Sequence, residues 1–431
     1  MFLQIRHMSP AEHLQEELPK YYWAVADSAL LQSIAQGAPI QRGSAGKRLN
    51  ALVRFFAKFR LVYLLLFVVG ALELGKLLLR QKRESSLRCE ARLGMPANHY
   101  PTCFFVGFGA GPEESLFAAY CAEKGGPVAR IDQTKVESMG QWHWVGVLAA
   151  FGSLLHSLTF AKQAVASLPT EYVPWKDDFL TFIGMRLGYF SYTCAWFRQL
   201  KANAPDVAEV CFLAADTAAF AAVNTGLPTR YLQHGLIRHS LVLPAFDRVD
   251  ALTNAEMRHF RQRLPATDIH LARTNMTPIA PRKPPCILVA SVYGHHEEMR
   301  RILSFLEFAA QHGIAIHVRP HPREDRNFWH TGDLPFSVLL EDSDASFDAA
   351  LERLRPSIVV SWFSTALVDA LYRSVIPVSV SALDDSNMKD MVYPLFRHCL
   401  HWPADQDVLQ RIISDDVAYE TALSGLRAGM E

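Results

Sequence analysis

Basic and hydroxyl side chains gather at two places in the last third of this 431-residue sequence. The first place is the turn Arg319-Pro320-His321-Pro322, which ends the alternating apolar run of residues 314–318. Its two prolines cannot continue the hydrogen-bonded ladder of a strand, so we expect a rigid, extended turn. A guanidinium and an imidazole held in such a turn are suited to bind an anionic group.

The second place is Ser364-Thr365, which follows the predicted strand Ser357–Val360 and begins a helix. The first turn of a helix has free backbone N–H groups and a positive dipole end, so hydroxyls there help to hold phosphate. Simple capping of the helix is the alternative role. Ligands of open α/β sheets bind beyond the carboxyl ends of the strands. We therefore predict one phosphate site that contains Arg319, His321, Pro322, Ser364 and Thr365.

A loop at residues 293–296 follows another predicted strand, and we expect Gly294 and His295 to face the same site. His295 is adjacent to His296, and this pair lacks the H-x-x-x-H spacing of a zinc site. The D-x-D pattern at Asp342 and Asp344 stands just before a predicted helix, where capping explains it. The sequence therefore predicts no metal site.

Two further polar residues end predicted strands in the first half of the chain. Asp216 ends the strand-like VCFLAAD, and His234 ends PTRYLQHG within Gln233-His234-Gly235. Capping of the next helix would account for Asp216. Strand ends also face the ligand cleft, where a carboxylate can remove a proton and an imidazole can orient a substrate. We predict Asp216 and His234 as the catalytic residues.

The elements that must position these residues alternate between strands and helices. This alternation predicts α/β architecture, with parallel sheets covered on both faces. We expect a helical segment at 1–100, a Rossmann-like domain at 101–262 and a second Rossmann-like domain at 285–431. Residues 263–284 are rich in proline and polar side chains, so we interpret them as the interdomain linker.

Gly107, Gly109 and Gly111 follow the first predicted strand. Pro112 stands where a dinucleotide-binding G-x-G-x-x-G motif needs its third glycine. A turn that lets a helix pack close to its strand explains these glycines better than nicotinamide binding does.

The N-terminal segment Lys47–Arg83 contains the uncharged apolar run Leu61–Leu72. This run is shorter than the ~20 apolar residues that a membrane-spanning helix needs. Basic residues flank it on both sides. Two interpretations stay open: a helix that lies in an anionic membrane interface or re-enters it, and a buried core helix with solvated ends.

Composition narrows the class of protein. Lys and Arg number 43, as do Asp and Glu, and this balance argues against a dedicated nucleic-acid binder. The seven cysteines form no C-x-x-C pair, which is typical of reduced thiols in a cytosolic protein. The first residues lack the pattern of a secretory signal. We expect a cytoplasmic protein that associates peripherally with the inner membrane.

The whole pattern resembles a bacterial glycosyltransferase of the GT-B fold, with two Rossmann-like domains that face each other across a cleft. His321-Pro322 and Ser364-Thr365 resemble the HP and serine/threonine motifs of sialyltransferases, polysialyltransferases and Kdo-type capsule or lipopolysaccharide transferases. The resemblance implies that His321, Ser364 and Thr365 hold the nucleotide phosphate of the donor. It also implies an acidic base in the N-terminal domain, for which Asp216 is the best-placed match.

We therefore expect a metal-independent glycosyltransferase with no cofactor besides its nucleotide-sugar substrate. A CMP-activated acidic sugar such as sialic acid or Kdo would pass to a surface glycan or a lipid-linked acceptor. A glycerophosphotransferase that uses a CDP-glycerol-type donor, and a nucleotide-sugar epimerase of the same fold, are the enzymatic alternatives. A membrane-associated scaffold without activity is the alternative from another class.

Overall fold

The computed structural model describes residues 44–58, 60–88, 101–107, 113–132, 139, 145–239, 241, 243–272, 277–291, 296–321, 324, 327–330, 334–342, 346–362, 364–381 and 391–428. Gly294, His295 and Pro322 of the predicted site lie outside these residues.

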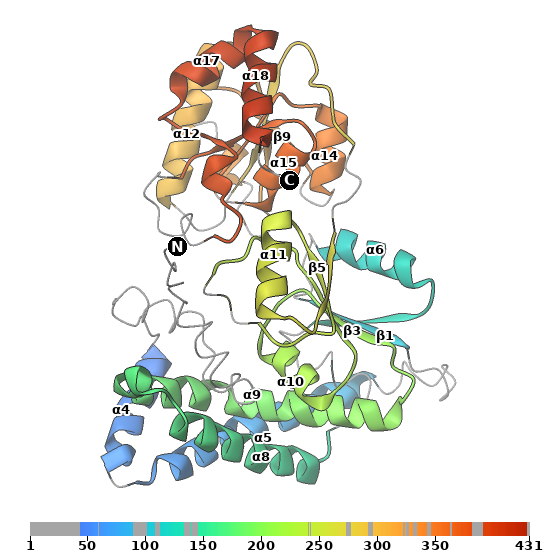
Figure 1. Ribbon diagram of the computed structural model, residues 1–431, viewed down its shortest axis with the longest axis vertical. Coiled ribbons are helices and arrows are strands. Elements are labelled where there is room, and N and C mark those ends of the chain that lie inside the picture. Colours follow the sequence, from blue (N-terminus) through green and yellow to red (C-terminus); the bar gives the residue numbers. More distant parts are fainter. Residues whose placement is uncertain are drawn as a thin grey trace, which may run out of the picture.

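Two six-stranded sheets organise the described chain, and every pair of neighbouring strands within each sheet is parallel. The order of the first sheet is β2-β1-β3-β4-β5-β6, and that of the second is β12-β11-β10-β7-β8-β9. The predicted pair of Rossmann-like domains is thus confirmed (Figure 1). The strands of the first sheet are β1 Cys103–Gly107, β2 Val128–Asp132, β3 Glu209–Phe212, β4 Thr229–Leu232, β5 Arg248–Ala251 and β6 Asp268–Leu271. Those of the second sheet are β7 Cys286–Ala290, β8 Ala315–Arg319, β9 Leu339–Leu340, β10 Ile358–Ser361, β11 Ile376–Ser379 and β12 Leu400–His401.

Helices cover both sheets. Those of the N-terminal part are α4 Ser44–Lys58, α5 Val62–Arg88, α6 Glu113–Lys124, α8 Val147–Ala166, α9 Lys176–Asn203, α10 Thr217–Thr225 and α11 Asn254–Arg263, with the 3₁₀ helix η2 at Thr170–Trp175. Those of the C-terminal part are α12 His296–Gln311, α13 Asn327–His330, α14 Phe347–Leu354, α15 Thr365–Tyr372, α17 Gln406–Ser414 and α18 Asp416–Arg427, with η3 at Leu395–Arg397.

The predicted linker at 263–284 is wrong in its first half, because β6 lies inside it and pairs with β5. β6 is the last strand of the sheet, and its Asp268 and His270 are exposed while Ile269 between them is buried. An edge strand with this alternation has little apolar sequence, which is why it resembled a polar linker. Residues 277–285 run along the second domain, where the Ile279 N–H donates to the carbonyl of Arg373.

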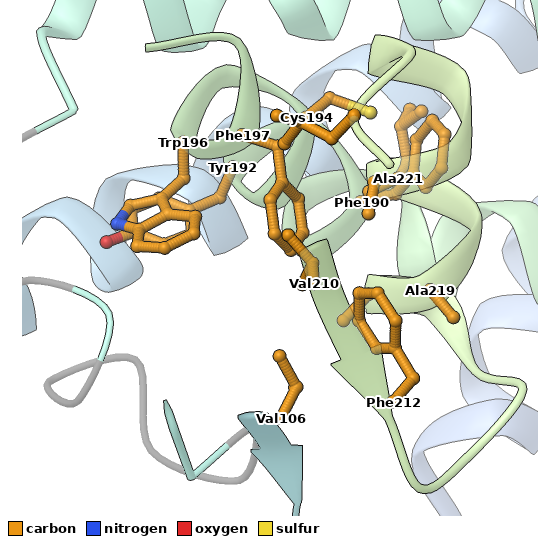
Figure 2. Packing of buried hydrophobic residues seen from close by; sticks show 14 of the residues in the cluster. Val106, Phe190, Tyr192, Cys194, Trp196, Phe197, Val210, Phe212, Ala219 and Ala221 are labelled. Carbon is orange, nitrogen blue, oxygen red and sulfur yellow. The ribbon is translucent and has the colours of Figure 1, made fainter. Parts of the chain in front are cut away.

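Helix α9 is the central element beneath the first sheet, and it packs against α4, α5, α8 and α10. Figure 1 shows these helices as a layer at the end of the molecule away from the second domain. The apolar core continues from the sheet into this layer, with Val106 of β1 and Phe212 of β3 packed in one cluster with Phe197 of α9 (Figure 2). The indole of Trp196 in the same core donates to the carbonyl of Met139 at 2.9 Å.

The close approach of α5 to α9 depends on Gly188 of α9. A Cβ atom at this position would lie 2.7 Å from both Cβ and Oε2 of Glu73 on α5. Such distances are far below van der Waals contact, so any side chain here forces the two helices apart.

We expect Gly188→Ala to destabilise the protein by about 1–3 kcal/mol, because overpacking of a close helix contact costs this much. Gly75→Ala on α5 is the matched control, since its Cβ would meet no atom within 4 Å. Alanine should there stabilise the helix by up to about 1 kcal/mol. Free energies of unfolding from urea titrations measure both changes, and equal effects of the two substitutions would contradict the packing account.

The two domains also touch outside the chain crossing. The Val392 N–H donates to the carbonyl of Ile237 at 3.0 Å, and Arg238 forms an isolated antiparallel bridge with Met391. Leu236 packs against the apolar cluster of the second domain that contains Tyr393. This contact joins the loop after β4 to the second domain only a few residues from His234.

Candidate functional site

A cleft of about 840 Å³ lies between the two domains, at the carboxyl ends of the strands in both sheets. Its walls include the predicted residues His234, Arg319, His321, Ser364 and Thr365. These residues stand far apart in the sequence, yet the two parallel sheets bring them to one place. Asp216 is not among the described residues that line this cleft.

The second-domain wall is set by the neighbours of β8. Ala290 of β7 pairs with Arg319 in register, and the Ser291 N–H donates to the Arg319 carbonyl at 3.1 Å. Beyond the strand, the backbone N–H of His321 donates to the Glu324 carboxylate at 3.1 Å. The indole of Trp329 donates to the other oxygen of the same carboxylate at 3.2 Å. Glu324 therefore fixes the turn that presents His321 to the cleft.

Ser364 and Thr365 occupy the start of α15 on the same wall. The Ser364 hydroxyl caps the helix, because it accepts from the N–H of Ala366 at 3.2 Å. α15 follows β10, which is the direct neighbour of β7. The chain leaves β7 toward β8 on one side and leaves β10 toward β11 on the other, so the two strands form the topological switch point. The positive end of the α15 dipole thus stands at the switch point, where phosphate binds in such sheets.

Ser291, which directly follows β7 at the middle of this wall, was not predicted as part of the site. Its side chain lines the cleft and is buried, and its hydroxyl has no hydrogen-bond partner among the described residues. An unpaired buried hydroxyl is costly, so a ligand group that pairs with it gains binding energy. The available signal was a hydroxyl residue directly after an apolar strand.

The first-domain wall presents His234 from a turn that Gln233 holds. The buried Gln233 amide donates to the Gly235 carbonyl at 2.8 Å and accepts from the Leu252 N–H at 3.1 Å. His234 itself faces the cleft and is exposed. Desolvation by the surrounding protein lowers its pKa, against the opposing effects of a hydrogen bond with the Leu213 backbone and the negative charge of Glu113. The imidazole is therefore neutral at pH 7.

Glu113, the first residue of α6, is a second residue that sequence analysis missed. It lines the cleft, is buried, and acts electrostatically on His234. Gly107 at the end of β1 makes room for it, because a Cβ atom there would lie 2.5 Å from Glu113 Oε2. Gly107 thus allows the close approach of a carboxylate to β1. In the sequence this residue was only a favourable acidic start of a helix.

Asp216 has the capping role that was the alternative interpretation. Its carboxylate accepts from the N–H groups of Ala218 and Ala219, at 3.0 and 3.2 Å, at the start of α10. Burial raises its pKa to about 6, although these N–H groups and the charge of Arg186 act in the opposite direction. Burial thus outweighs the groups that favour the charged form.

An ion cluster around the buried Arg230–Asp250 pair lines the first-domain end of the cleft. Arg230 pairs with Asp250 and makes a bidentate contact to Glu123, with distances of 2.6 and 3.0 Å. Glu209 accepts from the Tyr120 hydroxyl at 2.7 Å and pairs with Lys124. Opposite charges satisfy one another here, so this end of the cleft is rigid and polar.

We expect Asp216→Asn to stabilise the protein increasingly as the pH rises. The folded-state pKa of Asp216, about 6, lies above its ordinary value of 3.8. The folded protein therefore binds more protons between these values, and wild-type stability falls as the pH rises through that window. Asparagine stays neutral and still caps the helix, so its advantage should reach on the order of 1–2 kcal/mol above pH 7.

Urea unfolding at pH 5 and pH 8 measures this advantage. Asp216→Ala is the control, because it removes the cap and should be about 1 kcal/mol less stable than Asp216→Asn at both pH values. An Asp216→Asn advantage that does not change with pH would overturn the assignment.

No group of three or more His, Cys, Asp or Glu side chains within the described residues is arranged to hold a metal ion. The expectation of metal-independent chemistry remains a prediction.

No family model matches the sequence, and no curated protein matches it. Several solved structures have a similar arrangement. The glycosyltransferase SnogD from Streptomyces nogalater is 13% identical, with 76% of this chain and 94% of that chain covered and a TM-score of 0.45. The Methanocaldococcus jannaschii UDP-GlcNAc 2-epimerase in complex with UDP-GlcNAc and UDP is 9% identical, with 74% and 92% covered and a TM-score of 0.40. A glycosyltransferase from Rickettsia africae is 12% identical, with 78% and 95% covered and a TM-score of 0.39. Identity this low does not specify an activity or a substrate.

Proposed function

We propose that this protein is a glycosyltransferase that uses a nucleotide-activated sugar. The observation that carries the proposal is the composition of the cleft between the domains. Arg319, His321 and the α15 helix start form an anion-binding wall, and the His234–Glu113 pair stands on the opposite wall. An anion site that faces a neutral imidazole beside a carboxylate suits the transfer of a group from a phosphate to a hydroxyl.

The second-domain wall would stabilise the leaving phosphate. Negative charge grows on the nucleotide phosphate as the bond to the sugar breaks. The Arg319 guanidinium, the His321 imidazole and the α15 N-terminus lie on the wall where this charge would develop. Preorganised positive groups of this kind usually give the largest catalytic contribution. The unpaired Ser291 hydroxyl adds a donor at the same strand ends.

The first-domain wall would activate the acceptor. His234 is neutral at pH 7 because its pKa is lowered, so it can take the proton from an acceptor hydroxyl. The nearby negative charge of Glu113 then stabilises the imidazolium that forms. This assignment moves the acidic role from Asp216, which caps α10, to Glu113, which lines the cleft.

The proposed donor is a CMP-activated acidic sugar, with sialic acid and Kdo as the candidates, and the proposed acceptor is a surface glycan or glycolipid. The support is the pairing of an HP turn with a Ser-Thr helix start, which resembles transferases of capsule and lipopolysaccharide. We propose that the reaction needs no metal and no further cofactor. Three results would indicate the alternatives. Formation of a glycerophosphate polymer would indicate a glycerophosphotransferase, and isomerisation of the nucleotide-sugar would indicate an epimerase. Absence of nucleotide binding would indicate a scaffold.

We expect CMP, UDP or CDP at millimolar concentration to stabilise the protein by ~4 kcal/mol if its affinity is micromolar. His321→Ala should abolish this stabilisation, because the substitution removes a hydrogen-bond donor from the phosphate wall. His312→Ala, at the end of α12 outside the cleft lining, is the matched control that should keep it. Thermal-shift titrations with the three nucleotides measure the effect. If His321→Ala and His312→Ala respond alike, the phosphate wall is assigned wrongly.

We expect His234→Ala to lower kcat/KM about 10²–10⁴-fold, which is the usual contribution of a general base. In the wild type, kcat/KM should fall as the pH drops below the lowered pKa of His234. Glu113→Gln removes a charge that raises this pKa, so the acidic limb should move to still lower pH while the rate decreases.

Asp216→Asn separates this assignment from the prediction made from the sequence. It keeps the helix cap, so transfer should continue near the wild-type rate. If Asp216→Asn abolishes transfer while Glu113→Gln leaves it intact, Asp216 is the catalytic carboxylate. The measurement is kcat/KM across pH 5 to 9 with the donor that the nucleotide screen selects.

A further inference from the structure

Helix α5 has two sides of different character. Its inner side packs into the helical layer, where Leu66 and Leu74 are fully buried and Gly70 lies against Leu154 of α8 and Leu187 of α9. Its outer side carries leucine and valine side chains that are exposed in the part of the chain that the structure describes. Leu64, Val68, Leu72 and Leu79 on this side are 57%, 45%, 64% and 69% exposed.

The exposed apolar surface continues onto the helices that pack against α5. α4 and α8 both contact α5, and the three helices form the end of the molecule furthest from the second domain (Figure 1). We call the exposed large apolar residues of this end the apolar face. The apolar face consists of Leu52, Phe55, Leu61, Leu64, Val68, Leu72, Leu79, Val147, Leu148 and Leu155. Isolated exposed leucines are ordinary, but ten such residues on three adjoining helices mark an interaction surface.

The charges on α4 and α5 around this face are predominantly positive, and Arg54 also lies 4.0 Å from the carboxylate of Asp177 on α9. Residues 44–81 carry seven basic side chains and a single acidic one. The acidic residue, Glu73, packs against Gly188 of α9 rather than facing outward. The basic residues are all exposed: Lys47, Arg48, Arg54, Lys58, Arg60, Lys76 and Arg80. Exposed leucines bordered by lysine and arginine match the apolar boundary and the anionic headgroups of a lipid surface.

We propose that the apolar face of α4, α5 and α8 docks onto an anionic lipid surface, with α5 lying in the membrane plane. α5 is long and apolar enough over Val62–Gln81 to cross a membrane. Its inner side is nevertheless fixed to the domain by buried polar contacts. Gln81 accepts from the Tyr192 hydroxyl of α9 at 2.6 Å, and Asn50 of α4 donates to Thr181 of α9 at 2.9 Å.

Two other arrangements are an α5 that spans the bilayer and a second copy of this chain bound to the apolar face. A spanning α5 would have to leave α9, which would break the Gln81 contact and expose the buried core beneath it. A second copy of this chain would bring two like-charged faces together, which opposes association. An anionic lipid surface keeps the inner contacts and complements the charge.

The test is flotation of the full chain with vesicles of phosphatidylcholine alone and with added phosphatidylglycerol. We expect binding to the anionic vesicles, weakened by high salt, and about tenfold or greater loss in the double variant Leu64→Glu/Leu72→Glu. Val417→Glu on α18 is the matched control, because Val417 is 74% exposed at the other end of the molecule. Circular dichroism and the urea midpoint establish that each variant is folded.

Four results would overturn the proposal. The wild type could fail to bind anionic vesicles, or the folded double variant could bind them as well as the wild type. The protein in native membranes could resist extraction by alkaline carbonate, which would mean that α5 spans the bilayer. A dimer in sedimentation that the double variant abolishes, without vesicle binding, would assign the face to a second copy. Nucleotide binding should be unchanged in the double variant, so this test is independent of the proposed activity.

Discussion

The pairing of β7 with β8 on one side and β10 on the other is the constraint on which the candidate site depends. It places the carboxyl ends of three strands next to one another, although residues 291, 319 and 361 are far apart in the sequence. The Ser361 hydroxyl donates to the Ala290 carbonyl, which adds a side-chain contact to the backbone ladder at this point. Neighbouring strands are about 4.8 Å apart, so β8 and β10 on either side of β7 stand about 10 Å apart, and Arg319 and the start of α15 line the same cleft.

The opposite wall is built by different means. There, side chains connect the strands. Gln233 joins the ends of β4 and β5, and Arg230 with its acidic partners joins β4, β5 and α6. His234 projects from this turn, and its imidazole also forms a hydrogen bond with the Leu213 backbone. The turn that presents His321 is likewise held by another side chain, the carboxylate of Glu324.

Much of this architecture was predictable because buried parallel strands are continuous apolar runs with turn residues at each end. The strands β1, β3, β7, β8 and β10 overlap the runs that the sequence indicated. β6 was missed because an edge strand buries only one face and has little apolar sequence. The phosphate wall was predictable for a related reason, since Arg319 ends β8 and Ser364 caps the helix that follows β10.

Glu113 could not be predicted as part of the site. Its place depends on the five-residue turn between β1 and α6, and on a glycine that admits its carboxylate, and neither changes the local sequence pattern. Asp216 has the favourable position after a strand, yet its side chain folds back onto its own helix. Strand-end position is thus a good guide to location but a poor guide to the direction of a side chain.

The contact between Ile237 and Val392 has a mechanical consequence for the cleft. The domains are in contact here through this backbone hydrogen bond, the Arg238–Met391 bridge and the packing of Leu236, in addition to the chain crossing after β6. Several contacts on one side of the cleft favour relative motion of the domains as a rotation about that side. His234 stands three residues from Ile237, so such a rotation would move it less than the far rim of the cleft. Under the proposed function, the rim would then open for a bulky acceptor while the imidazole of His234 stays near its distance from the opposite domain.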